Sequence, residues 1–274
     1  MSEKSPVVHE NPWRKLRQFT DARIGLGRAG ISLPTQELLQ FQLAHAQAID
    51  AVHCPLDVTQ LRADLADAGL VAHPGQVLSL GSQAPDRSIY LQRPDFGRVL
   101  SEASAQRLQQ HTENSPAPAD LAIVIVDGLS SQAVQANAVP LIRQLMEDLN
   151  GGADDWRLAP FAVVEQGRVA IGDDIGARLK AKAVLVLIGE RPGLSSPDSL
   201  GAYLTWTPHV GRNDADRNCI SNIRPAGLRY PDASQKLLYL LREAFRRQLS
   251  GVALKDRTEE VVIDKPHEKN FLIQ

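Results

Sequence analysis

The sequence predicts an α/β protein in which a helical N-terminal region precedes a domain built on a mostly parallel sheet. Past residue 113, short apolar runs alternate with segments of helical spacing, and this alternation is typical of βαβ units in a covered sheet. Before that point the apolar residues recur at helical spacing. We therefore divide the chain into a flexible N-terminal tail (1–11), a helical region (12–112), an α/β domain (113–253) and a C-terminal tail (254–274).

The N-terminal region is expected to hold four helices joined by a loop rich in proline and glycine. The helices are predicted over 13–23, 35–53, 58–68 and 95–112, and the loop over 72–87. Thr35 is placed as the N-cap of the second helix, and proline after Cys54 ends that helix. His45 falls on the apolar face of the same helix, so we expect a packed histidine there.

The α/β domain is expected to alternate strands and helices along the chain. Strands are predicted over 121–126, 161–164, 183–188 and 203–206, and helices over 131–149, 173–180 and 233–249. Ligands of open α/β sheets bind beyond the carboxyl ends of the strands. The loops after the first and third strands, 127–131 and 189–193, should therefore face one crevice.

These two loops carry polar residues that allow more than one interpretation. Asp127 and the two serines at 130 and 131 fit the capping of the helix that follows them. Glu190 directly follows an apolar strand, where a carboxylate is costly unless it is exposed or paired. Either a ligand contact or an ion pair with Arg168 or Arg191 explains that glutamate.

Composition and charge exclude several classes of protein. Lys plus Arg number 30 against 32 Asp plus Glu, a net charge of −2, so the basic excess that nucleic-acid binding requires is missing. The longest apolar runs, 121–126 and 183–188, are far shorter than the roughly 20 residues that span a bilayer. No apolar segment marks a secretory signal, so we expect a cytoplasmic protein whose cysteines, Cys54 and Cys219, are reduced thiols.

Gly25, Gly27 and Gly30 match the G-x-G-x-x-G spacing of many dinucleotide-binding loops. That motif works only where it follows a strand and opens a helix, so that backbone N–H groups meet a pyrophosphate. Here it lies between two predicted helices. We expect the glycines to allow a tight turn or a close backbone approach, while Arg23 and Arg28 contact neighbouring surface.

The sequence contains no self-contained catalytic motif. There is no P-loop, no G-x-S-x-G elbow and no H-E-x-x-H, and the seven histidines are scattered. Cys219 has the chemistry of a nucleophile, but no histidine accompanies it locally, and such a thiol is more often a small packed group. We assign no catalytic residue and no metal ligand to this chain.

Five stretches of the chain are distinctive. They read Thr-Asp-Ala-Arg-Ile-Gly-Leu-Gly-Arg-Ala-Gly at 20–30, Tyr-Leu-Gln-Arg-Pro-Asp-Phe-Gly-Arg at 90–98, Asp-Gly-Leu-Ser at 127–130, Gly-Glu-Arg-Pro-Gly at 189–193 and Cys-Ile-Ser-Asn-Ile at 219–223. Together, and in consistent order over roughly residues 11 to 253, they resemble the small (light) subunit of ethanolamine ammonia-lyase.

The resemblance implies an adenosylcobalamin-dependent enzyme that converts ethanolamine to acetaldehyde and ammonia by a radical mechanism, in which the cofactor carries the hard chemistry. It implies a large-subunit partner, a TIM barrel that holds ethanolamine, in a hetero-oligomer with six copies of each subunit. This chain would supply a Rossmann-like domain that helps enclose the cobalamin. In some bacteria such an enzyme is packaged in a microcompartment with help from the small subunit's N-terminus, and the short leader here leaves that packaging open.

The resemblance also assigns cofactor contacts to three positions of this chain. Val169 of Gly-Arg-Val, Glu190 of Gly-Glu-Arg-Pro-Gly and Cys219 of Cys-Ile-Ser-Asn-Ile match cobalamin contacts of the family. Glu190 can accept hydrogen bonds from corrin side-chain amides, and Val169 can offer apolar contact. Cys219 would touch the cofactor without ligating cobalt. The sequence lacks the Asp-x-His-x-x-Gly segment that supplies a histidine ligand to base-off cobalamin.

Two other functions remain open from the sequence. A stand-alone nucleotide-binding oxidoreductase would use the same α/β domain, but it needs a G-x-G-x-x-G after the strand at 121–126, where the sequence has Asp-Gly-Leu-Ser. A non-catalytic assembly protein would differ from the cobalamin-binding subunit only in making no contact with a cofactor.

Overall fold

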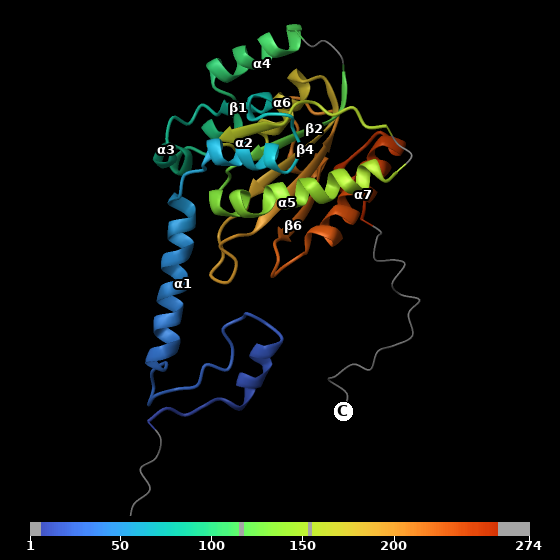
Figure 1. Ribbon diagram of the computed structural model, residues 1–274. Coiled ribbons are helices and arrows are strands. Elements are labelled where there is room, and N and C mark those ends of the chain that lie inside the picture. Colours follow the sequence, from blue (N-terminus) through green and yellow to red (C-terminus); the bar gives the residue numbers. More distant parts are fainter. Residues whose placement is uncertain (1–6, 115–117, 153–154, 257–274) are drawn as a thin grey trace, which may run out of the picture.

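The computed structural model describes residues 7–114, 118–152 and 155–256, and it shows a mixed α/β fold with one six-stranded sheet between helices (Figure 1). The strands are β1 (Leu78–Gly81), β2 (Ala119–Val126), β3 (Ala162–Glu165), β4 (Ala181–Gly189), β5 (Leu200–Trp206) and β6 (Arg217–Ile223), in the order β1-β3-β2-β4-β5-β6. The first four in this order are parallel, whereas β5 is antiparallel to both of its neighbours. The predicted α/β fold with a mostly parallel sheet is confirmed.

Helices cover the sheet on both faces. One apolar cluster joins α2 (Val58–Asp67), α5 (Ser131–Asn150) and α7 (Tyr230–Arg247) to one face of the strands. A second cluster joins α4 (Glu102–Asn114) and α6 (Ile171–Arg178) to the opposite face. Every residue of β2 is buried, which explains why this strand is a nearly continuous apolar run.

The central strand β2 marks the point where the order of the sheet reverses. The chain leaves β2 through α5 to reach β3 on one side, and it returns through α6 to reach β4 on the other side. The loops that follow β2, β3 and β4 therefore meet at one edge of the sheet. Open α/β sheets bind their ligands at such an edge.

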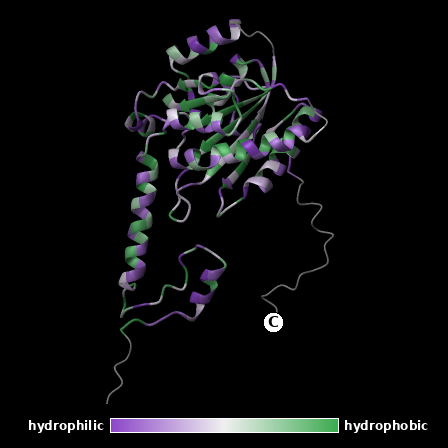
Figure 2. Cartoon of the chain, viewed as in Figure 1, coloured by the Kyte–Doolittle hydropathy of each residue, from purple (hydrophilic) through white to green (hydrophobic). Residues whose placement is uncertain are grey.

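The helix α1 (Thr35–His53) projects away from the sheet and carries the N-terminal residues at its far end (Figure 1). Apolar side chains on this helix face solvent in the chain alone, each 42–60% exposed: Leu38, Leu39, Phe41, Leu43 and Ile49. Figure 2 shows this mixture of hydrophobic and hydrophilic residues along the helix. His45 is also exposed, so the packed histidine predicted there is wrong for this chain on its own, because its side chain faces solvent like the apolar ones beside it on α1.

The glycine motif builds a turn and a close backbone approach, as predicted. Gly25, Gly27 and Gly30 all have positive φ angles, between +60° and +78°. A Cβ on Gly25 would lie 2.6 Å from the backbone nitrogen of Arg14, and one on Gly27 would lie 2.6 Å from the carbonyl oxygen of His9. Only glycine fits at these two positions. The segment therefore shapes an N-terminal hairpin, defined here as residues 9–33.

Contacts beyond the glycines hold this hairpin in place. His9 and Arg28 pair through two backbone hydrogen bonds of 2.7 and 2.9 Å. The Glu37 carboxylate at the start of α1 is buried and forms an ion pair with Arg17 at 2.8 Å. The guanidinium of Arg23 donates a hydrogen bond of 3.2 Å to the carbonyl of Leu194, in the loop between β4 and β5.

Some local predictions in the N-terminal region are wrong. Residues 78–81, predicted as loop, form β1, a four-residue edge strand too short to show a strand pattern. The helix predicted over 13–23 is a 3₁₀ helix, Pro12–Gln18, and the one predicted over 95–112 divides into a 3₁₀ turn, Phe96–Arg98, and α4. Pro34 occupies the N-cap position expected for Thr35.

In the α/β domain the predicted strands and helices are present with shifted ends, and one strand was missed. The missed strand is β6, which reads Arg-Asn-Cys-Ile-Ser-Asn-Ile. Its polar residues interrupt the apolar run by which the other strands were predicted. The predicted C-terminal tail begins with Leu254, which is buried in the core, and residues 257–274 lie outside the described residues.

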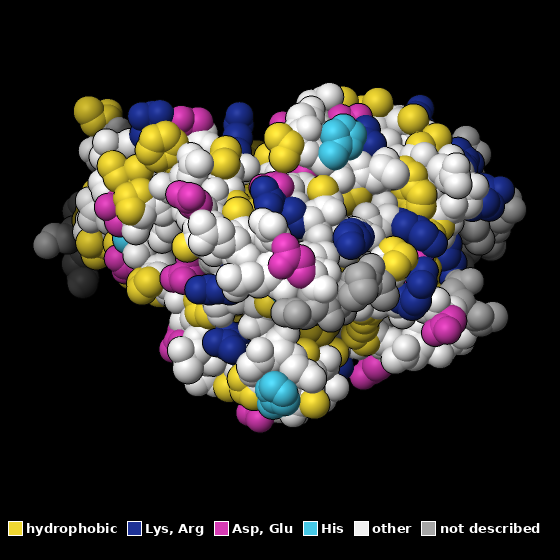
Figure 3. Space-filling view, turned by 90° about the horizontal axis from the view of Figure 1, so that it is seen from above, with side chains coloured by type: hydrophobic (Ala, Val, Ile, Leu, Met, Phe, Trp, Pro, Cys, Tyr) yellow, Lys and Arg dark blue, Asp and Glu magenta, His cyan; other side chains and the backbone are white. Residues whose placement is uncertain are grey.

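The surface mixes charges of both signs. Figure 3 shows a face on which Lys and Arg side chains alternate with Asp, Glu and apolar ones. No helix among the described residues has the length and apolar character needed to cross a membrane.

Candidate functional site

A cavity of about 400 Å³ lies at the carboxyl edge of the sheet, where the loops after β2, β3 and β4 meet. Its lining combines residues of these three loops with two tyrosines from elsewhere: Tyr90, Gly128, Leu129, Arg168, Val169, Ile188, Gly189, Glu190, Arg191 and Tyr203. The prediction that the loops 127–131 and 189–193 face one crevice is confirmed.

Glycines let two of these loops pack directly on each other. Gly128 has a φ of +59°, and a Cβ there would collide with the carbonyl oxygen of Gly189. A Cβ on Gly189 would in turn collide with the carbonyl oxygen of Ser130. The backbones therefore approach too closely for any side chain at either position, and this explains the glycine in both motifs.

Asp127 ties the loop after β2 to the loop after β3. Its carboxylate accepts hydrogen bonds from the backbone N–H groups of Gln166 at 2.8 Å and Gly167 at 3.0 Å, and the Arg87 guanidinium lies 3.6 Å away. Burial raises the pKa of Asp127 to about 6. The predicted helix cap is wrong for this residue, because its oxygens face the neighbouring loop.

The serine at 130 does have the predicted capping role. Its hydroxyl accepts a hydrogen bond of 3.1 Å from the backbone N–H of Ala133 and so caps α5. The same hydroxyl donates to the carbonyl of Pro197 at 2.7 Å, in the loop between β4 and β5. One serine therefore starts a helix and fixes the loop that carries Glu190.

Tyr90 and Arg168 line the site side by side, and Arg87 packs on the same tyrosine ring. The Tyr90 ring is fully buried, and its hydroxyl donates a hydrogen bond of 2.9 Å to the carbonyl of Gly167. The guanidinium groups of Arg87 and Arg168 lie 4.8 and 4.3 Å from the centre of this ring. Burial raises the pKa of Tyr90, so the hydroxyl stays protonated. Sequence reasoning assigned no role to this tyrosine, although it opens one of the five distinctive stretches.

One carboxylate oxygen of Glu190 accepts hydrogen bonds from the described residues, whereas the other accepts none. Oε2 accepts hydrogen bonds from the Ser199 hydroxyl and from the backbone N–H of Asn222, the latter at 3.2 Å. Oε1 lies 3.0 Å from the place where a Cβ of Gly201 would be, and it accepts no hydrogen bond from the part of the chain that is described. The structure shows no ion pair between Glu190 and Arg168 or Arg191 in that part, and hydrogen bonds from Ser199 and Asn222 hold the carboxylate instead.

Val169 and Cys219 occupy different positions relative to the cavity. Val169 is half-buried and lines the cavity beside Arg168. Cys219 lies opposite Tyr203 across the β5–β6 pair, with an exposed thiol 3.4 Å from the Ser221 hydroxyl. Burial raises the pKa of Tyr203, and a hydrogen bond with the Cys219 side chain raises it further. The structure therefore brings Val169 and Glu190 together and places Cys219 one strand beyond, connected to the cavity through Tyr203.

The site combines an apolar contact, an open carboxylate oxygen and several arginines. Within the described ranges no group of three or more His, Cys, Asp or Glu is arranged to hold a metal ion. Such a surface can bind a large ligand that carries both apolar and amide groups. The fold and this cavity define an α/β protein with a potential ligand site at the switch point of its sheet.

Comparison with known proteins shows which family this is. Residues 10–255 match the family model described as ethanolamine ammonia-lyase light chain (EutC). The chain is 56% identical over 266 residues to the ethanolamine ammonia-lyase small subunit of Pseudomonas aeruginosa (strain LESB58), covering 96% of this chain and 95% of the relative. It is 54% identical over 267 residues to the small subunit of Ralstonia nicotianae, which covers 97% of this chain and 96% of the relative. It is 55% identical over 264 residues to the small subunit of Azotobacter vinelandii, which covers 96% of this chain and 95% of the relative. The chain belongs to the ethanolamine ammonia-lyase small-subunit family.

Proposed function

We propose that this chain is the small subunit of an adenosylcobalamin-dependent ethanolamine ammonia-lyase, which converts ethanolamine to acetaldehyde and ammonia. The observation that carries the proposal is the pairing of Val169 with the half-open carboxylate of Glu190 in one cavity at the switch point of the sheet. The chain would help to bind cobalamin, while a large subunit holds the substrate. It would be a non-catalytic, cofactor-binding member of the complex.

The residues present fit a corrin. Cobalamin carries neutral side-chain amides around an apolar ring system, and it therefore needs both acceptors and apolar contacts. Oε1 of Glu190 is an open acceptor, and the absence of a side chain at Gly201 leaves room for the carboxylate. The buried Nε of Arg168 is a donor that no described residue satisfies, and an oxygen atom of the cofactor would satisfy it.

The residues of this chain would position the cofactor and exclude water. Val169 would pack against the corrin, Glu190 would accept a hydrogen bond from an amide, and Cys219 would contact the cofactor without binding cobalt. When bound, the cofactor supplies radical chemistry that begins with cleavage of its cobalt–carbon bond. Anchoring by Ser199 and Asn222 keeps the Glu190 carboxylate in place before binding, which lowers the cost of ordering it.

The exposed apolar residues of α1 support the proposed contact with the large subunit. A helix that leaves several large apolar side chains in solvent is typical of a surface that a partner covers. We propose that region 12–112 packs on the large subunit, in a hetero-oligomer with six copies of each subunit. The complex would work in the cytoplasm, with or without packaging in a microcompartment.

Reconstitution tests the activity. The purified chain alone should release no ammonia from ethanolamine, and mixing it with its large subunit and adenosylcobalamin should restore release. Ammonia released by this chain alone would contradict the proposal. A chain that binds NAD without a partner would support the stand-alone oxidoreductase instead.

A single substitution tests the site. Glu190→Ala should weaken cobalamin binding to the complex, measured by absorbance titration, without unfolding the chain. Glu165→Ala is the matched control, because Glu165 is the last residue of the parallel strand β3 but is exposed and does not line the cavity. Equal cofactor affinity in the two variants would remove Glu190 from the site.

A further inference from the structure

A second cavity, of about 410 Å³, adjoins the first. Arg168 and Val169 line both cavities. Four arginines contribute to its wall, which consists of Pro94, Arg98, Arg168, Val169, Ala170, Arg212, Asn213, Asp214 and Arg217. Asp214 is the one carboxylate in this lining, so the cavity concentrates positive charge.

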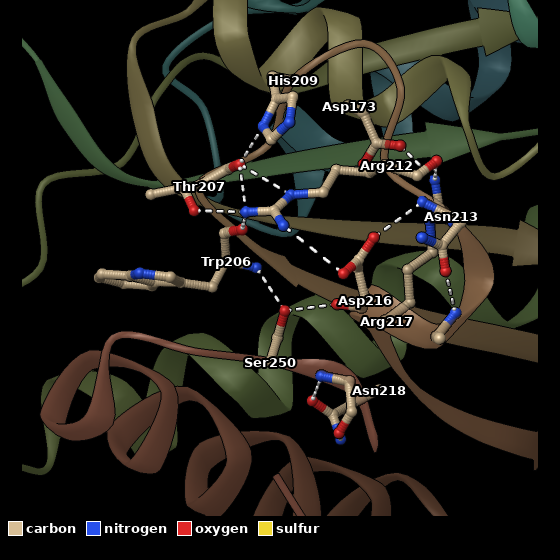
Figure 4. Close-up of polar contacts among 12 residues, drawn as sticks. Asp173, Trp206, Thr207, His209, Arg212, Asn213, Asp216, Arg217, Asn218 and Ser250 are labelled. Atoms are coloured by element: carbon tan, nitrogen blue, oxygen red, sulfur yellow. Dashed lines mark hydrogen bonds and ion pairs between the residues drawn. The ribbon is translucent and has the colours of Figure 1, made fainter. Parts of the chain in front are cut away.

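Two of the four arginines are engaged in building the wall (Figure 4). The Arg212 guanidinium donates to the hydroxyl of Thr207 at 2.7 Å and lies 3.5 Å from the Asp216 carboxylate. Arg217 is buried and forms ion pairs with Asp173 and, at 3.0 Å, with Asp214. These contacts fix the loop between β5 and β6 beside α6. Because carboxylates already neutralise the two arginines, they contribute little to the binding of a ligand.

The other two arginines are uncompensated. In the described part of the chain, the side chains of Arg98 and Arg168 form no ion pair and donate no hydrogen bond. The Arg168 guanidinium stacks on the Tyr90 ring, and its Nε is buried without a partner. The backbone N–H groups of Val169 and Ala170 likewise donate to no described residue. A buried donor without an acceptor, as the Arg168 Nε is, is costly, and together with the exposed guanidinium of Arg98 these donors are suited to an anion.

We infer that Arg98 and Arg168 form a binding site for a phosphate-class anion. Arginine presents several N–H donors in a planar arrangement that matches phosphate oxygens, and uncompensated arginines strengthen such contacts. The inference rests on the proposed function, because cobalamin carries one phosphodiester, in its nucleotide loop, among otherwise neutral side chains. Since Val169 lines both cavities, a ligand that packs on Val169 can extend from the first cavity into the second. The phosphodiester is the anion that we assign to Arg98 and Arg168, and free phosphate is the other source of the same chemistry.

Cobinamide separates the two parts of the ligand, because it keeps the corrin but lacks the phosphodiester and the nucleotide. The complex with the large subunit is titrated with cobalamin and with cobinamide, and binding is followed by absorbance. Arg98→Gln should weaken cobalamin binding about tenfold, as expected for one lost charge-assisted hydrogen bond, and should leave cobinamide binding unchanged. Arg168→Gln should act in the same direction.

Arg178→Gln is the matched control, because Arg178 lies on α6 but pairs with Asp174 at 2.8 Å and lines neither cavity. Its cobalamin affinity should equal that of the wild type. Melting temperatures of all variants show whether the fold is kept. An equal loss for cobalamin and cobinamide in Arg98→Gln, or no loss for either, would overturn the inference.

Inorganic phosphate tests the other source of the anion. If phosphate raises the melting temperature of the wild type but not of Arg98→Gln, while the two bind cobalamin equally, the assignment to the cofactor is wrong. A wild-type complex that binds no cobalamin at all would instead contradict the proposed function. The phosphate measurement on the same protein would then still decide whether Arg98 and Arg168 bind an anion.

Discussion

Arg217 and Asp173 form an ion pair in which each side chain is only 2% exposed. The pair joins the first residue of β6 to the first turn of α6. Burial raises the pKa of Asp173, so the charge on this residue depends on its partner.

Removing one member of this pair should be more harmful than removing both. Arg217→Leu leaves a buried carboxylate unpaired and should lower the free energy of unfolding by about 3–5 kcal/mol. The double variant Arg217→Leu/Asp173→Leu should recover much of this loss. Urea denaturation of the wild type, both single variants and the double variant measures the coupling, and additive losses would contradict it.

Asp127 should make the stability of the chain fall as the pH rises. Its pKa of about 6 in the folded state lies above the ordinary value of 3.8 for an aspartate, so between these two pH values the folded state holds a proton that the unfolded state has lost. Stability from this group is complete below pH 4 and is lost by about pH 6, a total of roughly 3 kcal/mol. Denaturation of the wild type and of Asp127→Asn between pH 4 and 7 should show this difference, and parallel curves would contradict it.

The glycine motif offers a matched pair of substitutions. Gly25→Ala meets both a positive φ and the backbone of Arg14, whereas Gly30→Ala meets a φ of +61° with no atom within 4 Å of its Cβ. Gly30→Ala should cost about 1 kcal/mol, and Gly25→Ala should open the N-terminal hairpin. Hydrogen exchange at the amides of His9 and Arg28 reports the opening. Equal exchange in the two variants would mean that the backbone approach at Gly25 is unimportant.

The hydroxyl of Tyr90 should stabilise the loop after β3. Tyr90→Phe removes its donor and leaves the buried carbonyl of Gly167 without that partner. The free energy of unfolding should fall by about 1–2 kcal/mol. Because the ring and its stacking on Arg168 remain, affinity for cobalamin should change little in a titration. A stability equal to that of the wild type would show that water replaces the hydroxyl.

The apolar residues of α1 should matter for assembly more than for folding. Leu39 and Leu43 are each about three-fifths exposed, at 59% and 60%. Leu39→Glu/Leu43→Glu should leave the melting temperature of the isolated chain unchanged and should weaken association with the large subunit, measured by size-exclusion chromatography. Gln36→Glu/Gln40→Glu adds the same charge at polar positions of α1 and serves as the control.

The sequence predicted the α/β fold because its central strands are continuous apolar runs. Each of the eight residues of β2 is buried, so their composition reports their position directly. The edges carry weaker signals. β6 alternates buried residues such as Ile220 with exposed ones such as Cys219, and β1 has only four residues. An edge strand is identified by its pairing with a neighbouring strand, and a single sequence does not show that pairing.

The candidate site was predictable only where a residue directly follows a strand. Glu190 stands at the end of β4 and could be found by that rule, whereas Tyr90 and Arg98 reach the site from α3 (Arg87–Gln92) and the turn after it. These contacts span more than 70 residues of chain, as the bond from Tyr90 to Gly167 illustrates. No local sequence pattern predicts a contact between residues so far apart in the chain.

The hydrogen bond from Arg23 to Leu194 closes a ring. One arm is α1, whose 19 residues make a rod about 28 Å long. The other arm is the loop 190–199, anchored at Glu190 and at Leu200 and held at its tip by the hairpin. The N-terminal hairpin is therefore connected to the rest of the chain in two ways. One connection is α1, and the other is the contact with the loop 190–199, which carries Glu190. The N-terminal hairpin is thus in direct contact with the loop that begins at Glu190, a residue of the cavity lining.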